Sequence, residues 1–190
     1  SEEERAESFL KAVAAGAAGI DMQGYTFHEP SKDNFCGDNK YSFTKNNPKE
    51  IVTDKKIILK QCEFIEKIHA CGAEVLLLCH PGIPMNTQEV TELALFLEKR
   101  KPDIIKIVTI AQNEEDLIES FKTMLTLKKE VKTKVSYHAG GAIGRLSRII
   151  NPVLGGHIAF CVDRFNSGST MEQIDLKTAY IMLNNIERII

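Results

Sequence analysis

Short, nearly uninterrupted apolar runs alternate with longer amphipathic segments along most of this chain. The runs are typical of β-strands and none has a clean polar face; they are 74–80 (EVLLLCH), 102–111 (PDIIKIVTIA), 134–140 (KVSYHAG) and 157–162 (HIAFCV). Strands that are buried on both faces occur in parallel sheets, whose connections are helices. The alternation therefore predicts an α/β fold with a parallel sheet and helices outside it.

The segments between these runs carry helix signals. Helices are predicted over 1–17, from Thr53 to about 69, from Thr87, from Asn113, over 147–154 and over 170–190, with an additional short strand at 19–24. Leu125, Leu176 and Tyr180 are expected on the buried faces of their helices. Residues 28–50 are polar and rich in turn-forming residues, which predicts a long loop. About five strand–helix units are visible, and an open α/β sheet and a (β/α) barrel both fit them.

Composition excludes several classes of partner. Lys+Arg 24 against Asp+Glu 26 gives a net charge of −2, so no basic field directs the chain to nucleic acid or to an anionic membrane. Five cysteines without a CxxC pair favour a reducing compartment, and we expect a cytoplasmic protein without a membrane-spanning segment. No GxGxxG, GxxxxGK[ST] or HExxH motif is present, so we expect neither a bound cofactor nor a metal.

Lys106 stands in the middle of the apolar run 102–111. A buried lysine costs several kcal/mol unless it is paired or loses its proton, and its neutral amine is a nucleophile toward carbonyl groups. His80 ends the strand before that of Lys106, His138 lies on the strand after it, and Arg148 follows; α/β folds place their chemistry at the carboxyl ends of strands. The set suggests Schiff-base chemistry on an acidic carbonyl substrate. A structural alternative remains for each residue, since strand lysines can reach water at a sheet edge and single histidines usually serve the fold.

Four motifs in chain order resemble the type I 3-dehydroquinase family. They are the EVLLLCH strand, the DIIKI strand, the run GRLSRI at 144–149 with Gly155 and Phe160 beyond it, and STMEQI at 169–174. The resemblance implies a (β/α)8 TIM-barrel fold, of which residues 1–190, as a single domain, would form the C-terminal five-eighths. It also implies a lyase that dehydrates 3-dehydroquinate to 3-dehydroshikimate in the shikimate pathway. The partner would be this small molecule, no cofactor would be needed, and a homodimer is an option.

The family mechanism gives roles to the matching positions. Lys106 would form an imine with the substrate ketone, and His80 would remove the adjacent proton and return one to the departing hydroxyl. Arg148 would bind the substrate carboxylate, while Ser169 and Gln173 would close over the substrate.

The chain also departs from the family pattern. Gln23 stands where the family's I-D-L-E strand carries the glutamate that pairs with the histidine, and its amide could orient His80 by a hydrogen bond. His138 adds a polar group on the face that carries the site, where it would contact the substrate. Two alternatives follow: a non-catalytic or diverged homologue that binds a related cyclic keto acid, and another Schiff-base aldolase or lyase.

Overall fold

The centre of the protein is a four-stranded parallel sheet. The computed structural model describes residues 1–28, 42–44, 47–49, 52–166 and 173–187. The strand order is β1-β4-β5-β6, formed by Gly19–Gln23, Glu74–Cys79, Ile104–Ile110 and Lys134–Gly140. The connections carry α2 (Lys55–Ala70), α3 (Thr87–Glu98) and α4 (Glu114–Glu130), and α1 (Glu2–Ala14) precedes β1. The predicted parallel α/β architecture is confirmed.

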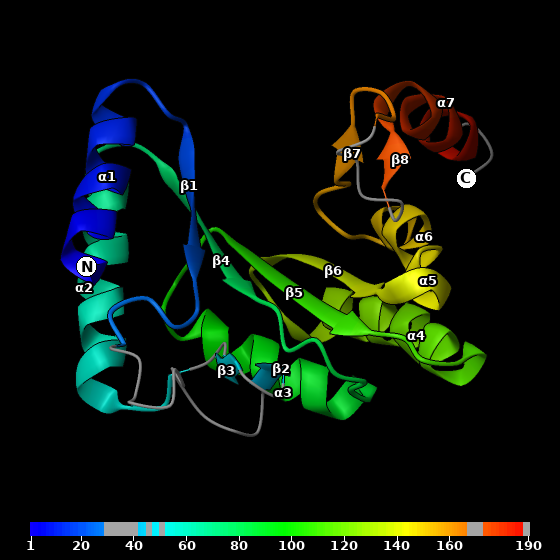
Figure 1. Cartoon of the computed structure of the whole chain (residues 1–190), viewed down its shortest axis with the longest axis horizontal. Helices are drawn as coiled ribbons and strands as arrows, with labels where there is room; N and C mark the ends of the chain where they lie inside the picture. The colour runs from blue at the N-terminus through cyan, green and yellow to red at the C-terminus, as the bar shows by residue number, and fades with distance from the viewer. Residues whose placement is uncertain (29–41, 45–46, 50–51, 167–172, 188–190) are drawn as a thin grey trace.

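The hydrophobic core lies between the sheet and its helices. Alternate strand side chains, including Val75, Leu77, Ile105 and Ile107, point to this side and are fully buried. The helices α2, α3 and α4 follow one face of the twisted sheet (Figure 1). Burial of each such side chain contributes about 1.5–3 kcal/mol, so this layer holds the strands in place. The other alternate residues, among them Lys106, face away from the helices and are free to form a site.

A buried polar network fixes the loop that follows β1. Arg100 is 1% exposed and donates hydrogen bonds to the Gln61 side chain (2.6 Å), the Val52 carbonyl (2.9 Å) and the Phe96 carbonyl (3.0 Å). The Gln61 amide in turn donates to the carbonyls of Gly24 and Thr26, at 2.9 and 2.8 Å. The backbone that leaves β1 is therefore anchored to α2 and to the end of α3.

Two predicted helix caps are wrong by one residue. The α2 cap is Asp54, whose carboxylate accepts hydrogen bonds from the backbone of the next turn at 2.8 and 3.2 Å. The α3 cap is Asn86, which forms a reciprocal capping box with Glu89. In both places two residues that favour the cap position are adjacent, and the one whose side chain accepts the backbone hydrogen bonds is Asp54 in α2 and Asn86 in α3. The predicted cap of α4, Asn113, is confirmed.

Several boundaries near the carboxyl end also differ from prediction. Of the strand predicted at 157–162, only β7 (Cys161–Val162) is a strand, and it pairs in parallel with β8 (Ile174–Asp175). The last helix, α7, spans Leu176–Glu187, so it begins well after residue 170. The helix predicted over 1–17 ends at Ala14, and two short strands, β2 (Ser42–Thr44) and β3 (Asn47–Lys49), pair within the predicted loop 28–50.

Three residues predicted to face inward are exposed. Leu125, Leu176 and Tyr180 lie on the outer sides of their helices. In α4 the buried positions are instead Ser120, Thr123, Met124 and Leu127. Helix α7 packs on α6 and β7 rather than on the four-stranded sheet, so its predicted stripe stays partly uncovered.

Candidate active site

The sheet register gathers polar side chains on the face away from the helices. Gln23, Leu78, Lys106 and Ser136 form one row across the four strands. The next row toward the carboxyl ends contains His138 directly beside Val108. His80 follows the last paired residue of β4 and shares the face of Leu78, which places it in the same row on the other side of Val108.

A cavity of about 370 Å³ opens above these rows. Its polar lining comprises Lys106, His80, His138, Arg148, Gln173 and Thr109. Its apolar lining includes Val108, Ile110 and Phe160. The carboxyl ends of parallel strands are where α/β proteins place their active sites, so this cavity is the candidate site.

Lys106 is 9% exposed at the floor of the cavity. Burial lowers the pKa of its amine, the Asp21 carboxylate partly offsets this, and the charge of Arg148 lowers the pKa further. Its Nζ lies 4.2 Å from the centre of the Phe160 ring, which covers the amine on one side. A lowered pKa increases the fraction of neutral amine, and this is the nucleophilic form.

Both histidines of the cavity are held neutral. Burial and the charges of Lys106 and Arg148 lower the pKa of His80 from 6.5 to about 4. The pKa of His138 falls to about 3 because of burial, Arg148, Lys106 and His80. A neutral imidazole offers one donor and one acceptor nitrogen, so each ring has an unprotonated nitrogen that can act as a base at neutral pH.

Arg148 is placed by a tight connection between β6 and the helices α5 (Gly141–Gly144) and α6 (Ser147–Val153). The buried Ser147 hydroxyl accepts from the Ala139 backbone N–H (2.8 Å) and lies 2.6 Å from the Gly144 carbonyl, to which it donates. The Asn151 amide donates to the Tyr137 carbonyl at 2.8 Å. These contacts lock the start of α6 to the sheet, and they explain the serine that precedes the arginine.

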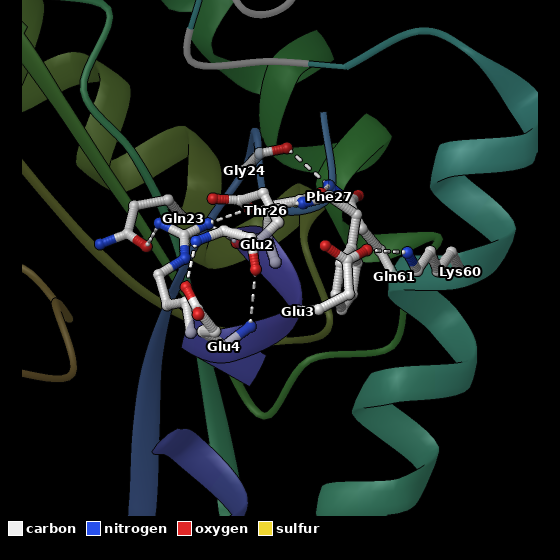
Figure 2. A network of polar contacts seen from close by, with 11 residues as sticks. Glu2, Glu3, Glu4, Gln23, Gly24, Thr26, Phe27, Lys60 and Gln61 are labelled. Atoms are coloured by element: carbon white, nitrogen blue, oxygen red, sulfur yellow. Dashed lines mark hydrogen bonds and ion pairs between the residues drawn. The ribbon is translucent and has the colours of Figure 1, made fainter. Parts of the chain in front are cut away.

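Gln23 takes part in a different network from the cavity lining. Its Oε1 accepts a hydrogen bond of 2.8 Å from Arg5 of α1, and Arg5 also donates to Thr26 (2.9 Å) and forms an ion pair with Glu2 (2.5 Å). Figure 2 shows Gln23, Thr26 and Glu2 gathered at the end of β1. The amide oxygen is thus committed to Arg5, which leaves the Gln23 amide N–H groups for other contacts.

Two residues near the amine were missed by sequence reasoning. Asp21 shares the face of Gln23 and is electrostatically coupled to Lys106, while burial raises the pKa of its carboxyl. The alternation of strand side chains could have identified it. Phe160 contacts both Lys106 and His138, with its ring centre 6.4 Å from that of His138. Phe160 belongs to the family-like motif of the sequence, but no role was predicted for it, because its position depends on the irregular path after α6.

The structure thus brings together Lys106, His80, His138, Arg148 and Gln173 of the predicted site. Ser169 lies outside the described residues. Within the described part of the chain, no group of three or more His, Cys, Asp or Glu side chains could hold a metal ion. Across the same described ranges, no helix has the length and apolar character required to cross a bilayer.

Comparison with known proteins finds related sequences and structures of one family. The model of the protein family described as type I 3-dehydroquinase matches residues 59–189 of this chain. A 3-dehydroquinate dehydratase of Coxiella burnetii is 30% identical over 115 residues, which cover 58% of this chain and 47% of that protein. The chain spans about half the length of the curated relatives it matches.

Solved structures of the same kind resemble the whole chain. The type I 3-dehydroquinate dehydratase of Clostridium difficile, with covalently modified comenic acid, matches with a TM-score of 0.75 at 15% identity, covering 100% of this chain and 63% of that one. The enzyme from Enterococcus faecalis matches with a TM-score of 0.68 at 14% identity, covering 97% and 61%. Identity at this level shows the fold, and the predicted TIM-barrel fold class is confirmed.

Proposed function

Because the chain belongs to the type I 3-dehydroquinase family, we propose that it acts as a class I Schiff-base lyase that dehydrates 3-dehydroquinate to 3-dehydroshikimate. The observation that carries this proposal is the buried Lys106 amine in one cavity with His80 and Arg148. An imine next to the breaking C–H bond withdraws its electrons, and among side chains an amine is required to form it.

The residues divide the work of binding and proton transfer. Lys106 attacks the ketone, and His80 accepts the proton from the carbon next to the imine and returns a proton to the leaving hydroxyl. Arg148 holds the substrate carboxylate by parallel hydrogen bonds, with Gln173 and Ser169 closing over it and His138 in contact with the ring. Gln23 orients the site from the end of β1. The two cationic groups of the cavity favour an anionic substrate, and the cysteine usage leads us to place the enzyme in the cytoplasm.

The proposal is tested by following dehydration of 3-dehydroquinate by NMR with the unchanged chain and two variants. Lys106→Met removes the amine but keeps the length of the side chain. Lys99→Met removes an exposed lysine at the end of α3 and serves as the matched control. We expect product from the unchanged chain and from the control, and none from Lys106→Met. Turnover by Lys106→Met would refute the Schiff-base mechanism.

A second candidate, a homologue that binds the same class of ligand without converting it, is favoured by one observation. Gln23 replaces the glutamate of the family pattern, and its carbonyl oxygen is bound by Arg5 rather than serving as a charged partner of an imidazole. Calorimetric binding of 3-dehydroquinate without product and without a borohydride-trapped amine would establish this function in place of the lyase.

A further inference from the structure

His138 occupies a position that mirrors that of His80 across Lys106. Lys106 projects from β5, His80 follows β4 on one side, and His138 lies on β6 on the other. Both histidines stand one row above the lysine, on either side of Val108. Neighbouring strands are about 4.8 Å apart, so the backbones of the two histidines are separated by roughly 10 Å. A ligand bonded to the amine therefore lies between two imidazole rings.

The surroundings of His138 suit a group that carries protons. It is 5% exposed and lines the cavity. Its neighbours are Lys106 from β5, Arg148 from α6, His80 from β4 and the ring of Phe160. Burial and the cations Lys106 and Arg148 disfavour a lasting charge on the ring, so the ring is neutral before and after each proton transfer. A purely structural histidine would not need a place beside the amine.

We propose that His138 is a second acid–base group of this site, which transfers protons between nitrogen and oxygen while the imine on Lys106 forms and hydrolyses. This inference rests on the proposed Schiff-base function, in which His80 removes the proton from carbon and returns one to the leaving hydroxyl of the substrate. The two imidazoles divide the work because each reaches the side of the ligand that is nearer to its own strand.

The proton balance of imine formation shows the need for such a group. A lysine ammonium and a ketone give an iminium ion and water, so three hydrogens on nitrogen become one on nitrogen and two on water. His138 first takes a proton from the ammonium. The amine then bonds to the carbonyl carbon, the C=O π electrons move to oxygen, and His138 protonates that oxygen.

The second transfer completes the step. His138 takes another proton from the nitrogen of this adduct and delivers it to the hydroxyl, which leaves as water as the C–O bond breaks. The nitrogen lone pair forms the C=N bond. No proton, electron or further reactant is required from outside, and the imidazole returns to its neutral state. Hydrolysis of the product imine follows the same steps in reverse.

The experiment is a time course of borohydride trapping with 3-dehydroquinate, followed by intact-mass spectrometry. His138→Asn keeps a polar side chain that cannot carry a proton, and we expect it to slow trapping by about 10²-fold or more. His80→Asn should be trapped at close to the unchanged rate while forming no product. His157→Asn, a substitution of an exposed histidine, is the matched control.

A second readout separates catalysis from structure. In the unchanged chain, deuterium at the substrate carbon that loses its proton slows dehydration. If imine formation limits the rate in His138→Asn, this kinetic isotope effect on dehydration should fall toward 1. His138→Ala supplied with free imidazole should recover part of the trapping rate, and this variant also serves if His138→Asn does not fold. Trapping of His138→Asn at the unchanged rate, or no recovery with imidazole, would overturn the inference. An unchanged chain that forms no adduct would overturn the proposed function itself.

Discussion

Replacing Gly144 by alanine should disturb the site from a distance, because the added methyl group has no room. A Cβ at this position would lie 2.5 Å from the Ala139 carbonyl oxygen and 2.7 Å from its carbonyl carbon. Ordinary contacts begin at 3.4 Å, so the end of α5 must move away from β6 by about 1 Å. The opposing atoms belong to the backbone and cannot rotate out of the way.

Two energetic effects oppose each other in this variant. Alanine is favoured over glycine in a helix by about 1 kcal/mol. Overpacking against a well-packed neighbour costs about 1–3 kcal/mol and sometimes more. Since Ser147 ties the same turn to Ala139 at 2.8 Å, the turn cannot relax without weakening that hydrogen bond as well. We therefore expect the clash to dominate, with a net loss of about 1–2 kcal/mol in the free energy of unfolding.

The assay combines urea unfolding with the rate of borohydride trapping. Arg148 lies four residues beyond Gly144, and a displacement of about 1 Å should slow the trapping reaction by about 10²-fold. Ala142→Ser, at an exposed position of the same short helix, is the control and should change neither quantity. Unaltered stability and an unaltered trapping rate in Gly144→Ala would refute the view that this close contact positions Arg148.

Three further predictions concern buried charge. Lys106→Met should raise the free energy of unfolding by about 1 kcal/mol in urea, because an amine that burial disfavours is replaced by an apolar side chain; a loss of stability would contradict this. Arg100→Met should lower the free energy of unfolding by about 3 kcal/mol, because the buried Gln61 and Val52 oxygens lose their hydrogen-bond donor. In the same urea titration, the control Lys99→Met should leave the free energy of unfolding nearly unchanged. As the pH falls from about 6.5 to about 5, the unfolded chain binds protons that His80 and His138 in the folded chain do not. Stability measured by urea unfolding should therefore drop by up to about 1.4 kcal/mol per pH unit for each histidine, and a constant stability over this range would contradict the account.

The face of the sheet on which each side chain lies was predictable, because strand side chains alternate between the two faces with a period of two residues. Side chains alternate along a parallel strand, so the spacing from Leu78 to His80 and from Ser136 to His138 places both histidines on the face of Lys106. A core of this kind fixes the register of each strand, since a shift by one residue would turn its apolar side chains away from the helices.

Other features depend on contacts between distant segments and could not be predicted. The segment that follows α6 begins to pair with β6, since the His157 N–H donates to the Val135 carbonyl at 2.7 Å, but it then turns away to form β7. Apolar composition alone suggested a full strand there. Likewise, Gln23 is bound by Arg5 because the first turn of α1 lies beside the carboxyl end of β1, which no local pattern in either segment indicates.

The most direct test of the account is the mass of the purified chain after borohydride reduction in the presence of 3-dehydroquinate, followed by peptide mapping. The account predicts one added ligand, located on Lys106, with the exposed lysines unmodified. A folded chain that gains no mass, or that carries the ligand on another lysine, would contradict the claim that Lys106 is the amine of a Schiff-base site.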